Sequence, residues 1–307
     1  MPKLALKIDV DTLRGTLEGV PPLVAMLQKH QAQATFLFSL GPDNTGRALR
    51  RIFRPGFLKK VFRTNVAANY GLKTLMYGVL IPGPDIGRKG AAAMRAVRDA
   101  GFEVGIHTWD HIRWQDFVAR RDATWTRHEF VQAVERFREV FGTEPKTFGA
   151  AGWQMNFDAF ELEHEFHMSY ASDTRGTHPF MPEMRGRVFS VPQIPTTLPT
   201  LDELVGVNGI TVDNVAEHLL KLTAGPAPEH GHVYTLHAEL EGMALSPVFD
   251  ALLTGWRAQG YELVATQTIA AGLNRKTLPM HTVIMGELPG RSGTLAMQAG
   301  PCVPVPV

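Results

Sequence analysis

The chain has 307 residues, of which 44% are hydrophobic and 20% charged, so it can bury a sizeable core and is not a disordered protein. A formal net charge of +1 excludes a whole-molecule attraction to nucleic acid or to an anionic membrane, so any such attraction must be local. The only cysteine, Cys302, excludes an intramolecular disulfide and a thiolate zinc cluster, which fits a reducing compartment.

The start of the chain predicts neither export nor a membrane span. Met1-Pro2-Lys3 leads directly into a mixed strand pattern, where a signal peptide would need an apolar region. The longest apolar stretch, residues 75–84, contains glycine and two prolines and is well short of the ~20 residues that a spanning helix requires. We therefore expect a cytoplasmic protein that can touch a membrane without crossing it.

Strand-like and helix-like stretches alternate along most of the chain. Leu4, Leu6 and Ile8 alternate with other residues as in a strand, and residues 18–31 have helical spacing. Further strands are expected at residues 34–40, 102–107, 146–150, 168–172, 232–237 and 261–265, and further helices at residues 90–100, 127–141, 156–167, 212–223 and 247–259. This alternation predicts an α/β fold with a parallel sheet, either closed as a barrel or open with helices on both faces.

Two segments interrupt the alternation within what we expect to be one catalytic domain, residues 1–277. An insertion at about residues 44–88 carries no acidic residue up to Pro84, and its basic residues are interleaved with apolar ones at helical spacing. That pattern is typical of an amphipathic interfacial segment, and a solvated basic face over an ordinary core is the alternative. Residues 278–307 are rich in Gly and Pro and are expected to be a C-terminal tail, either an ordered wrap or loose.

In parallel α/β folds, functional groups collect at the carboxyl ends of strands. The polar groups and turns expected there are Asp9, Asp11, His107, residues 149–153, Asp173 and His237. The chain has no Gly-x-Ser-x-Gly elbow, no phosphate loop and no Gly-x-Gly-x-x-Gly after the first strand. Serine hydrolase, P-loop and Rossmann dehydrogenase functions therefore lose their main support.

The spacing of His107 and His111 suits a metal site. One helical turn between them would place both imidazoles on one face. Together with a carboxylate from Asp9 or Asp11 they would form a two-His, one-carboxylate set with an open position for water, which suits zinc, iron, cobalt or manganese. The alternative is that the two histidines only pack or cap a helix.

Asp9 and Asp11 point the same way if the strand is extended, because side chains alternate with a period of two. Two like charges in one small site repel each other. A metal beside one carboxylate relieves the repulsion and leaves the other free as a base. The pair therefore favours a cation, although Asp11 can also serve to cap the next turn.

Asp-x-Asp at the first strand, His107-Thr108-Trp109-Asp110-His111 and Leu236-His237 occur in an order that resembles the polysaccharide deacetylase superfamily of carbohydrate esterases. Further matches at residues 41–44, 150–153, 193–200 and 237–242 look like the bacterial deformylases of that superfamily, which act on a formamido sugar carried on undecaprenyl phosphate. The similarity extends from the first strand to at least Gly242.

The resemblance implies a distorted (β/α) barrel, with parallel strands and helices outside, that removes formate from 4-deoxy-4-formamido-L-arabinose in a metal-dependent reaction. The product would serve lipid A modification and polymyxin resistance. The implied roles are general base for Asp9, general acid for His237, and ligands of one divalent ion (zinc, or manganese/cobalt) for Asp11, His107 and His111. A general metal-dependent sugar or peptidoglycan N-deacetylase and a non-enzymatic membrane-surface module are the alternatives.

Two departures from the superfamily concern supporting residues. The superfamily usually brings an arginine toward the catalytic aspartate, whereas residues 149–153 contain no cation. Arg175, just after Asp173 in a place where the superfamily usually has Asp-Trp, is our candidate to replace it. Trp153 is a candidate to close the acyl pocket so that formyl fits and acetyl does not, with a buried core indole as the alternative.

A polyprenyl-phosphate substrate would lie in the bilayer. Each Lys or Arg near an anionic lipid surface contributes roughly 1 kcal/mol of attraction. We therefore expect peripheral binding at the cytoplasmic face of the bacterial inner membrane, with no nucleic acid and no obligate protein partner. The expected membrane contacts are Arg50, Arg51, Arg54, Lys59, Lys60 and Arg63.

Overall fold

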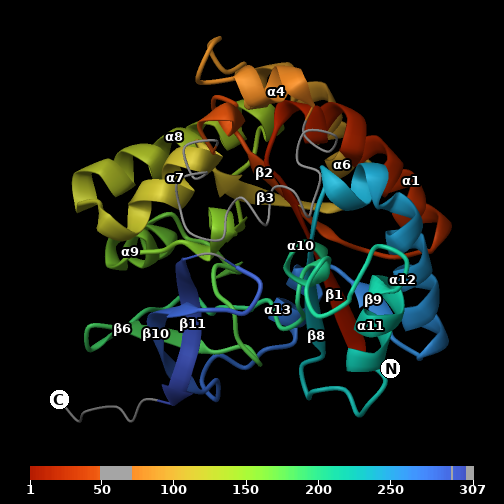
Figure 1. The fold of residues 1–307 in the computed structure, drawn as a ribbon. Helices are drawn as coiled ribbons and strands as arrows, with labels where there is room; N and C mark the ends of the chain where they lie inside the picture. The colour runs from red at the N-terminus through yellow and green to blue at the C-terminus, as the bar shows by residue number, and fades with distance from the viewer. Residues whose placement is uncertain (49–70, 292, 302–307) are drawn as a thin grey trace.

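The computed structural model describes residues 1–48, 71–291 and 293–301 (Figure 1). A seven-stranded sheet in which every pairing is parallel forms its centre. The strands are β1 (Lys3–Val10), β2 (Thr35–Ser39), β3 (Glu103–Thr108), β4 (Thr147–Phe148), β5 (Tyr170–Ala171), β8 (His232–His237) and β9 (Glu262–Val264). Their order is β5-β4-β3-β2-β1-β8, and β9 pairs with the start of β1.

β1 is the buried centre of this sheet. It pairs with β2 and β8 on its two sides, and every residue from Leu4 to Val10 is buried. A strand enclosed in this way has no solvent face, so the polar residues that it carries need partners inside the protein. The register sets Asp9 opposite His237 of β8, and this brings residues from the two ends of the sequence together.

An irregular segment at residues 193–198 fills the space between β5 and β8. Ile194 N donates a hydrogen bond to Ala171 O (2.8 Å), and Thr197 N donates to Val233 O (3.1 Å). The backbone of this segment therefore bonds to both edges of the sheet, without forming a regular strand. This closure gives the distorted (β/α) barrel that the family resemblance implied, and the fold class is confirmed.

Helices surround the sheet (Figure 1). They are α1 (Val20–Lys29), α4 (Leu72–Met76), α5 (Ile86–Lys89), α6 (Ala91–Asp99), α7 (His111–Phe117), α8 (Ala123–Phe141), α9 (Phe157–Glu165), α10 (Leu201–Leu204), α11 (Val215–Leu222), α12 (Ser246–Ala258) and α13 (Thr266–Ala271). α8 begins where the side chain of Asp122 accepts a hydrogen bond from Trp125 N, and it ends at Gly142, whose φ of 69° suits a left-handed cap. Its buried face packs aromatic rings against the sheet, as in the contact of Phe130 with Phe148.

The C-terminal region forms strands that the sequence pattern did not indicate. β10 (Met280–Glu287) and β11 (Thr294–Pro301) are antiparallel, and with β6 (Met181–Met184) and β7 (Arg187–Val188) they make a second, four-stranded sheet. Arg175 attaches this sheet to the barrel, because its N donates to Ala296 O (2.9 Å) and its O accepts from Gln298 N (2.8 Å). The described part of the expected tail is therefore ordered against the barrel.

Most of the basic insertion lies outside the described residues. This includes every residue expected to contact the membrane: Arg50, Arg51, Arg54, Lys59, Lys60 and Arg63. The described parts of the insertion contain α4 and α5 and the turn between them.

Glu129 of α8 is a buried carboxylate whose nearest cation is Arg113 of α7, with Nη1 3.1 Å from Oε1. Burial raises the pKa of Glu129 from 4.5 to about 7, and Arg113 offsets this only in part. Between these two values the folded protein holds a proton that the unfolded chain releases. The contribution of Glu129 to stability is thus present at low pH and is lost as the pH rises through this window.

We expect Glu129→Gln, which stays neutral, to be more stable than the wild type by about 2 kcal/mol at about pH 8, and to differ little at about pH 4. Urea unfolding at both pH values measures this, with Glu135→Gln, an exposed position of the same helix, as the control. Parallel pH dependences for the wild type and Glu129→Gln would contradict the assignment.

Candidate active site

Asp11, His107 and His111 converge at the carboxyl end of β1 and β3. One ligand atom of each lies within 4.8 Å of the others. Asp11 Oδ1 is 3.3 Å from His107 Nε2, and Asp11 Oδ2 is 3.4 Å from His111 Nε2. Asp11 Oδ1 is buried and has no hydrogen-bond partner among the described residues. A buried carboxylate oxygen without a donor, facing two imidazoles, fits the donor set that zinc, cobalt and manganese accept.

The two histidines meet through a strand, a turn and a helix, and not through the single helical turn that their spacing suggested. His107 belongs to β3, and His111 is the first residue of α7. Asp110 makes the turn between them, because its Oδ1 accepts from Arg113 N (3.0 Å) and caps the helix. The centroids of the two imidazole rings are 5.3 Å apart. The two histidines therefore converge as expected, although a strand, a turn and a helix bring them together.

A hydrogen bond fixes which nitrogen His107 presents. Its Nδ1 donates to Gly149 O (2.7 Å), which leaves the lone pair of Nε2 facing Asp11. Asp173 supports this arrangement, since its Oδ1 accepts from Ala150 N (2.7 Å) and its Oδ2 from Gln193 Nε2 (3.0 Å). Asp173 therefore acts on the site through the backbone turn that orients His107.

The carboxylates and imidazoles in this cluster shift one another's pKa toward the charged forms. Burial would raise the pKa of Asp11, but His111 and His107 outweigh it and hold the pKa well below its usual range. Burial would likewise lower the pKa of His107, whereas Asp9 and Asp11 raise it above its ordinary value. The cluster is thus built around an ionised Asp11 that requires positive charge beside it.

Lys7 is the cation next to Asp9. Its Nζ lies 3.8 Å from Asp9 Oδ2, donates to Ser172 O (2.7 Å), and is fully buried. Burial lowers the pKa of Lys7, although Asp9 and Asp173 act in the opposite direction. Our sequence reasoning missed Lys7, but the signal was present, because a residue two positions before Asp9 on a strand points to the same side.

Arg175 does not take the place beside Asp9 that we had expected for it. Its Nη1 is 2.6 Å from Glu203 Oε1, and its Nη2 donates to Leu198 O (3.0 Å). A buried arginine is stabilised most by a buried carboxylate, and Glu203, also buried, supplies one. The hypothesis that Arg175 replaces the missing cation at Asp9 is therefore wrong, and Lys7 fills that position.

Trp153 is buried within a group of cations. Its ring lies 5.4 Å from Lys7 Nζ, 5.1 Å from Arg175 Cζ and 4.5 Å from Arg291 Cζ. Its indole Nε1 donates to Thr196 Oγ1 (3.2 Å). The ring attracts these cations, of which Lys7 lies beside Asp9 and the two arginines beside Glu203. Whether Trp153 also selects the acyl group stays a prediction.

His237 lies across from this cluster at the end of β8. Its backbone N donates to Glu241 Oε2 (3.0 Å), and its Nδ1 is buried without a hydrogen-bond partner among the described residues. Burial lowers the pKa of His237, but the nearby carboxylates, with Asp11 the strongest, raise it above its ordinary value. The protonated imidazole, which can give up a proton, is thereby favoured.

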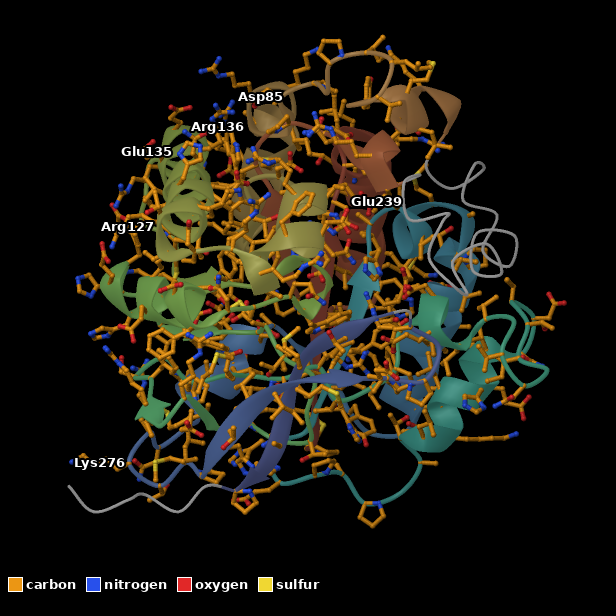
Figure 2. All side chains as sticks on the ribbon, turned by 60° about the vertical axis from the view of Figure 1, so that its left-hand side comes forward. Asp85, Arg127, Glu135, Arg136, Glu239 and Lys276 are labelled. Carbon is orange, nitrogen blue, oxygen red and sulfur yellow. The ribbon has the colours of Figure 1, made fainter. Side chains whose placement is uncertain are left out.

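Glu239 is a second residue that the sequence reasoning did not single out. Its Oε1 accepts hydrogen bonds from Asp11 N (3.1 Å), Thr12 N (2.9 Å) and Thr12 Oγ1 (2.7 Å). Figure 2 shows Glu239 inside the molecule, whereas Arg127 and Glu135 lie at its edge. Glu239 fixes the turn that carries Asp11, and no motif spacing could have linked two segments so distant in the sequence.

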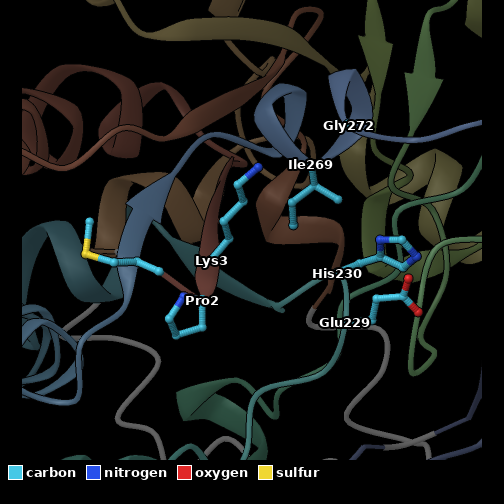
Figure 3. A pocket seen from close by; sticks show the side chains of 7 residues that line it. Pro2, Lys3, Glu229, His230, Ile269 and Gly272 are labelled. Atoms are coloured by element: carbon cyan, nitrogen blue, oxygen red, sulfur yellow. The ribbon is translucent and has the colours of Figure 1, made fainter.

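A separate pocket lies near the start of β1, at the end of the strand opposite the Asp11 cluster (Figure 3). Lys3, Glu229, His230 and Ile269 are among its lining residues. None of the residues predicted for catalysis lines it, so it is not the candidate active site.

Residues 4–171 match the profile of the polysaccharide deacetylase family. The chain belongs to this family. A Mycobacterium smegmatis protein described as a polysaccharide deacetylase shares the fold, with a TM-score of 0.62 at 16% identity over 94% of this chain and 96% of its own.

Two relatives within the family carry the same name, "Probable 4-deoxy-4-formamido-L-arabinose-phosphoundecaprenol deformylase". The protein from Shewanella sediminis is 37% identical over 97% of this chain and 95% of its own length. The protein from Wigglesworthia glossinidia brevipalpis is 31% identical over 92% of this chain and 98% of its own length.

We expect Asp11→Asn and His111→Ala each to weaken the binding of zinc or manganese by at least about tenfold, because each removes one of three donors. Metal content after dialysis against a metal buffer measures this. His128→Ala, which changes an exposed histidine of α8, serves as the control. Unchanged metal content in Asp11→Asn would refute the ligand set.

We expect Lys7→Met to lower kcat for amide hydrolysis by at least about tenfold with little change in KM or metal content, because it leaves Asp9 buried without its cation. Lys3→Met, a change on the same strand but away from Asp9, is the control. A fall in metal content that accounts for the whole loss would show that Lys7 acts only on the folding of the site.

Proposed function

We propose that the protein hydrolyses the formamide of 4-deoxy-4-formamido-L-arabinose carried on undecaprenyl phosphate, and so releases formate and the 4-amino sugar lipid. One observation carries the proposal. The Asp11, His107 and His111 cluster lies beside Asp9, which is paired in register with His237, in a chain that is 37% identical over 97% of its length to a relative with that name.

Asp11, His107 and His111 would hold one divalent ion, and zinc, manganese and cobalt all suit the three donors. When bound, such an ion would polarise the carbonyl oxygen of an amide and lower the pKa of a water toward ~7. The hydrogen bond from His107 Nδ1 to Gly149 O keeps Nε2 available to it.

Asp9 and His237 divide the proton transfers between them. Asp9, held next to Lys7, takes a proton from the attacking water as a new C–O bond forms to the formyl carbon. His237, paired in register with Asp9, gives its proton to the amine nitrogen as the C–N bond breaks. Burial lowers the pKa of His237, but the neighbouring carboxylates raise it above its ordinary value, which favours the protonated form that this step needs.

The function proposed here places the protein at a membrane, because its substrate has a polyprenyl tail. No helix in the described part of the chain combines the length and the apolarity needed to span a bilayer. The basic residues from Arg50 to Arg63 supply the attraction to anionic lipid at the cytoplasmic face of the inner membrane. The product serves lipid A modification and polymyxin resistance, and no obligate protein partner is required.

We expect the metal-loaded protein to release formate from the formamido sugar lipid at least about tenfold faster than acetate from the N-acetyl counterpart, since one added methyl group is worth about 10- to 200-fold in a fitted pocket. Formate and acetate assays on the two lipids measure the ratio. Faster acetate release would favour a general sugar N-deacetylase.

The same assay separates an enzyme from a membrane-binding module. His107→Ala should abolish formate release, because it removes a predicted metal donor. Formate release that is absent from the wild-type protein, or that survives in His107→Ala, would contradict the mechanism.

A further inference from the structure

Large apolar side chains are grouped at the last residue of α4 and on the short turn that follows it. Met76 is 37% exposed, Val79 51%, Leu80 74% and Ile81 36%. The turn at residues 76–81 is held by its own backbone, since Leu80 N donates to Met76 O (2.9 Å) and Gly78 N to Ile81 O (2.8 Å). Exposed apolar side chains gathered in one place mark an interaction site.

The turn is attached to the rim of the active site. Gly46 N donates to Tyr77 O (3.0 Å), and Arg47 Nε donates to Gly78 O (3.0 Å). Gly78 also packs so closely on Asn44 that a Cβ there would lie 2.4 Å from Asn44 Oδ1.

Asn44 in turn reaches the candidate metal centre. Its Nδ2 donates to Asp110 Oδ2 (2.6 Å), and Asp110 caps the helix that His111 begins. Figure 1 shows α4 at the end of the molecule opposite the N-terminus, which is the end toward which β1 runs. A partner bound to the turn at residues 76–81 would therefore also lie next to the candidate active site.

The charges around the turn are positive. Arg47 and the exposed Lys73 precede it, and the exposed Arg88 and Lys89 follow it. No acidic residue occurs between residues 44 and 84, and Asp85 is paired with Arg136 and also lies 3.9 Å from Arg88 Nε. An apolar tip surrounded by cations matches the surface of a bilayer, which offers acyl chains below anionic head groups.

We propose that the turn at residues 76–81 inserts into an anionic lipid surface and holds the mouth of the active site against the bilayer. This rests on the function proposed above, because a sugar linked to a polyprenyl chain can reach the site only from the membrane. Leu80 and Val79 enter the acyl region, while the flanking basic residues remain at the level of the head groups.

Sedimentation with vesicles of phosphatidylglycerol and phosphatidylethanolamine tests the insertion. Burial of one leucine side chain in an apolar phase is worth about tenfold or more in a partition coefficient, so Leu80→Asp should lower vesicle binding by at least that factor. Val212→Asp changes another exposed apolar residue on a turn, 43% exposed, and should bind as the wild type does. A wild type that fails to bind, or a Leu80→Asp variant that binds equally well, overturns the proposal.

Activity on two substrates separates this proposal from the proposed function. Leu80→Asp should turn over a water-soluble formamido-arabinose phosphate at the wild-type rate, which shows that it is folded, and should lose at least about tenfold on the polyprenyl-linked substrate in vesicles. If the wild type turns over neither substrate, the proposed function fails, while the vesicle comparison still decides whether the turn inserts.

Light scattering completes the test. The turn would instead be an interface between two copies of this chain if Leu80→Asp changed the oligomeric state and left vesicle binding intact. That result would overturn membrane insertion.

Discussion

The structure depends on how one fully buried strand accommodates charge. β1 carries Lys7 and Asp9, and Asp11 follows it, all inside the barrel. Charges removed from water are tolerated only when partners inside the protein replace the lost hydration. Lys7 lies beside Asp9, and two imidazoles lie beside Asp11. The same requirement that stabilises the strand therefore gathers the proposed base Asp9, the candidate metal ligands and the cation Lys7 in one place.

The second ring of contacts around this strand is made mostly by backbone groups. Gly149 O orients His107, and Asp173 holds the turn to which Gly149 belongs. Glu239 receives the backbone N–H groups of Asp11 and Thr12. Main-chain atoms are fixed by the sheet and its turns, so the side chains that they orient have little freedom to drift. The barrel thus supplies rigidity at the point where the proposed chemistry requires it.

The spacing of apolar residues predicted the helices and strands that this spacing alone determines. The expected strands of the barrel match β1 to β5, β8 and β9, and the expected helices match α1, α6, α8, α9, α11 and α12. β6, β7, β10 and β11 were not expected, because the pairing of β10 with β6 joins residues about 100 positions apart. The faces of β6 and β10 also alternate only weakly between buried and exposed.

The residues of the candidate site also fall into those that the sequence predicted and those that it did not. The family motifs and the rule on strand ends brought Asp9, Asp11, His107, His111 and His237 to one place. Arg175 was assigned to Asp9 because no cation followed β4, yet Glu203, 28 positions later, takes it instead. Lys7 was overlooked although it precedes Asp9 by two positions on the same strand and therefore faces the same side. Pairings between distant side chains depend on the completed fold, and no spacing within one segment encodes them.

The ordered C-terminal hairpin means that the chain finishes its active site last. Arg291 shares the carboxylate of Glu203 with Arg175 over the ring of Trp153, and β11 bonds to the backbone of Arg175. A ribosome synthesises the barrel strands first, so the nascent protein already contains its acids and imidazoles before the residues that enclose them emerge. A message cut short near its 3′ end would therefore yield a recognisable barrel with an unfinished interior. For this protein, loss of the final strands would disturb the interior of the candidate active site as well as the surface.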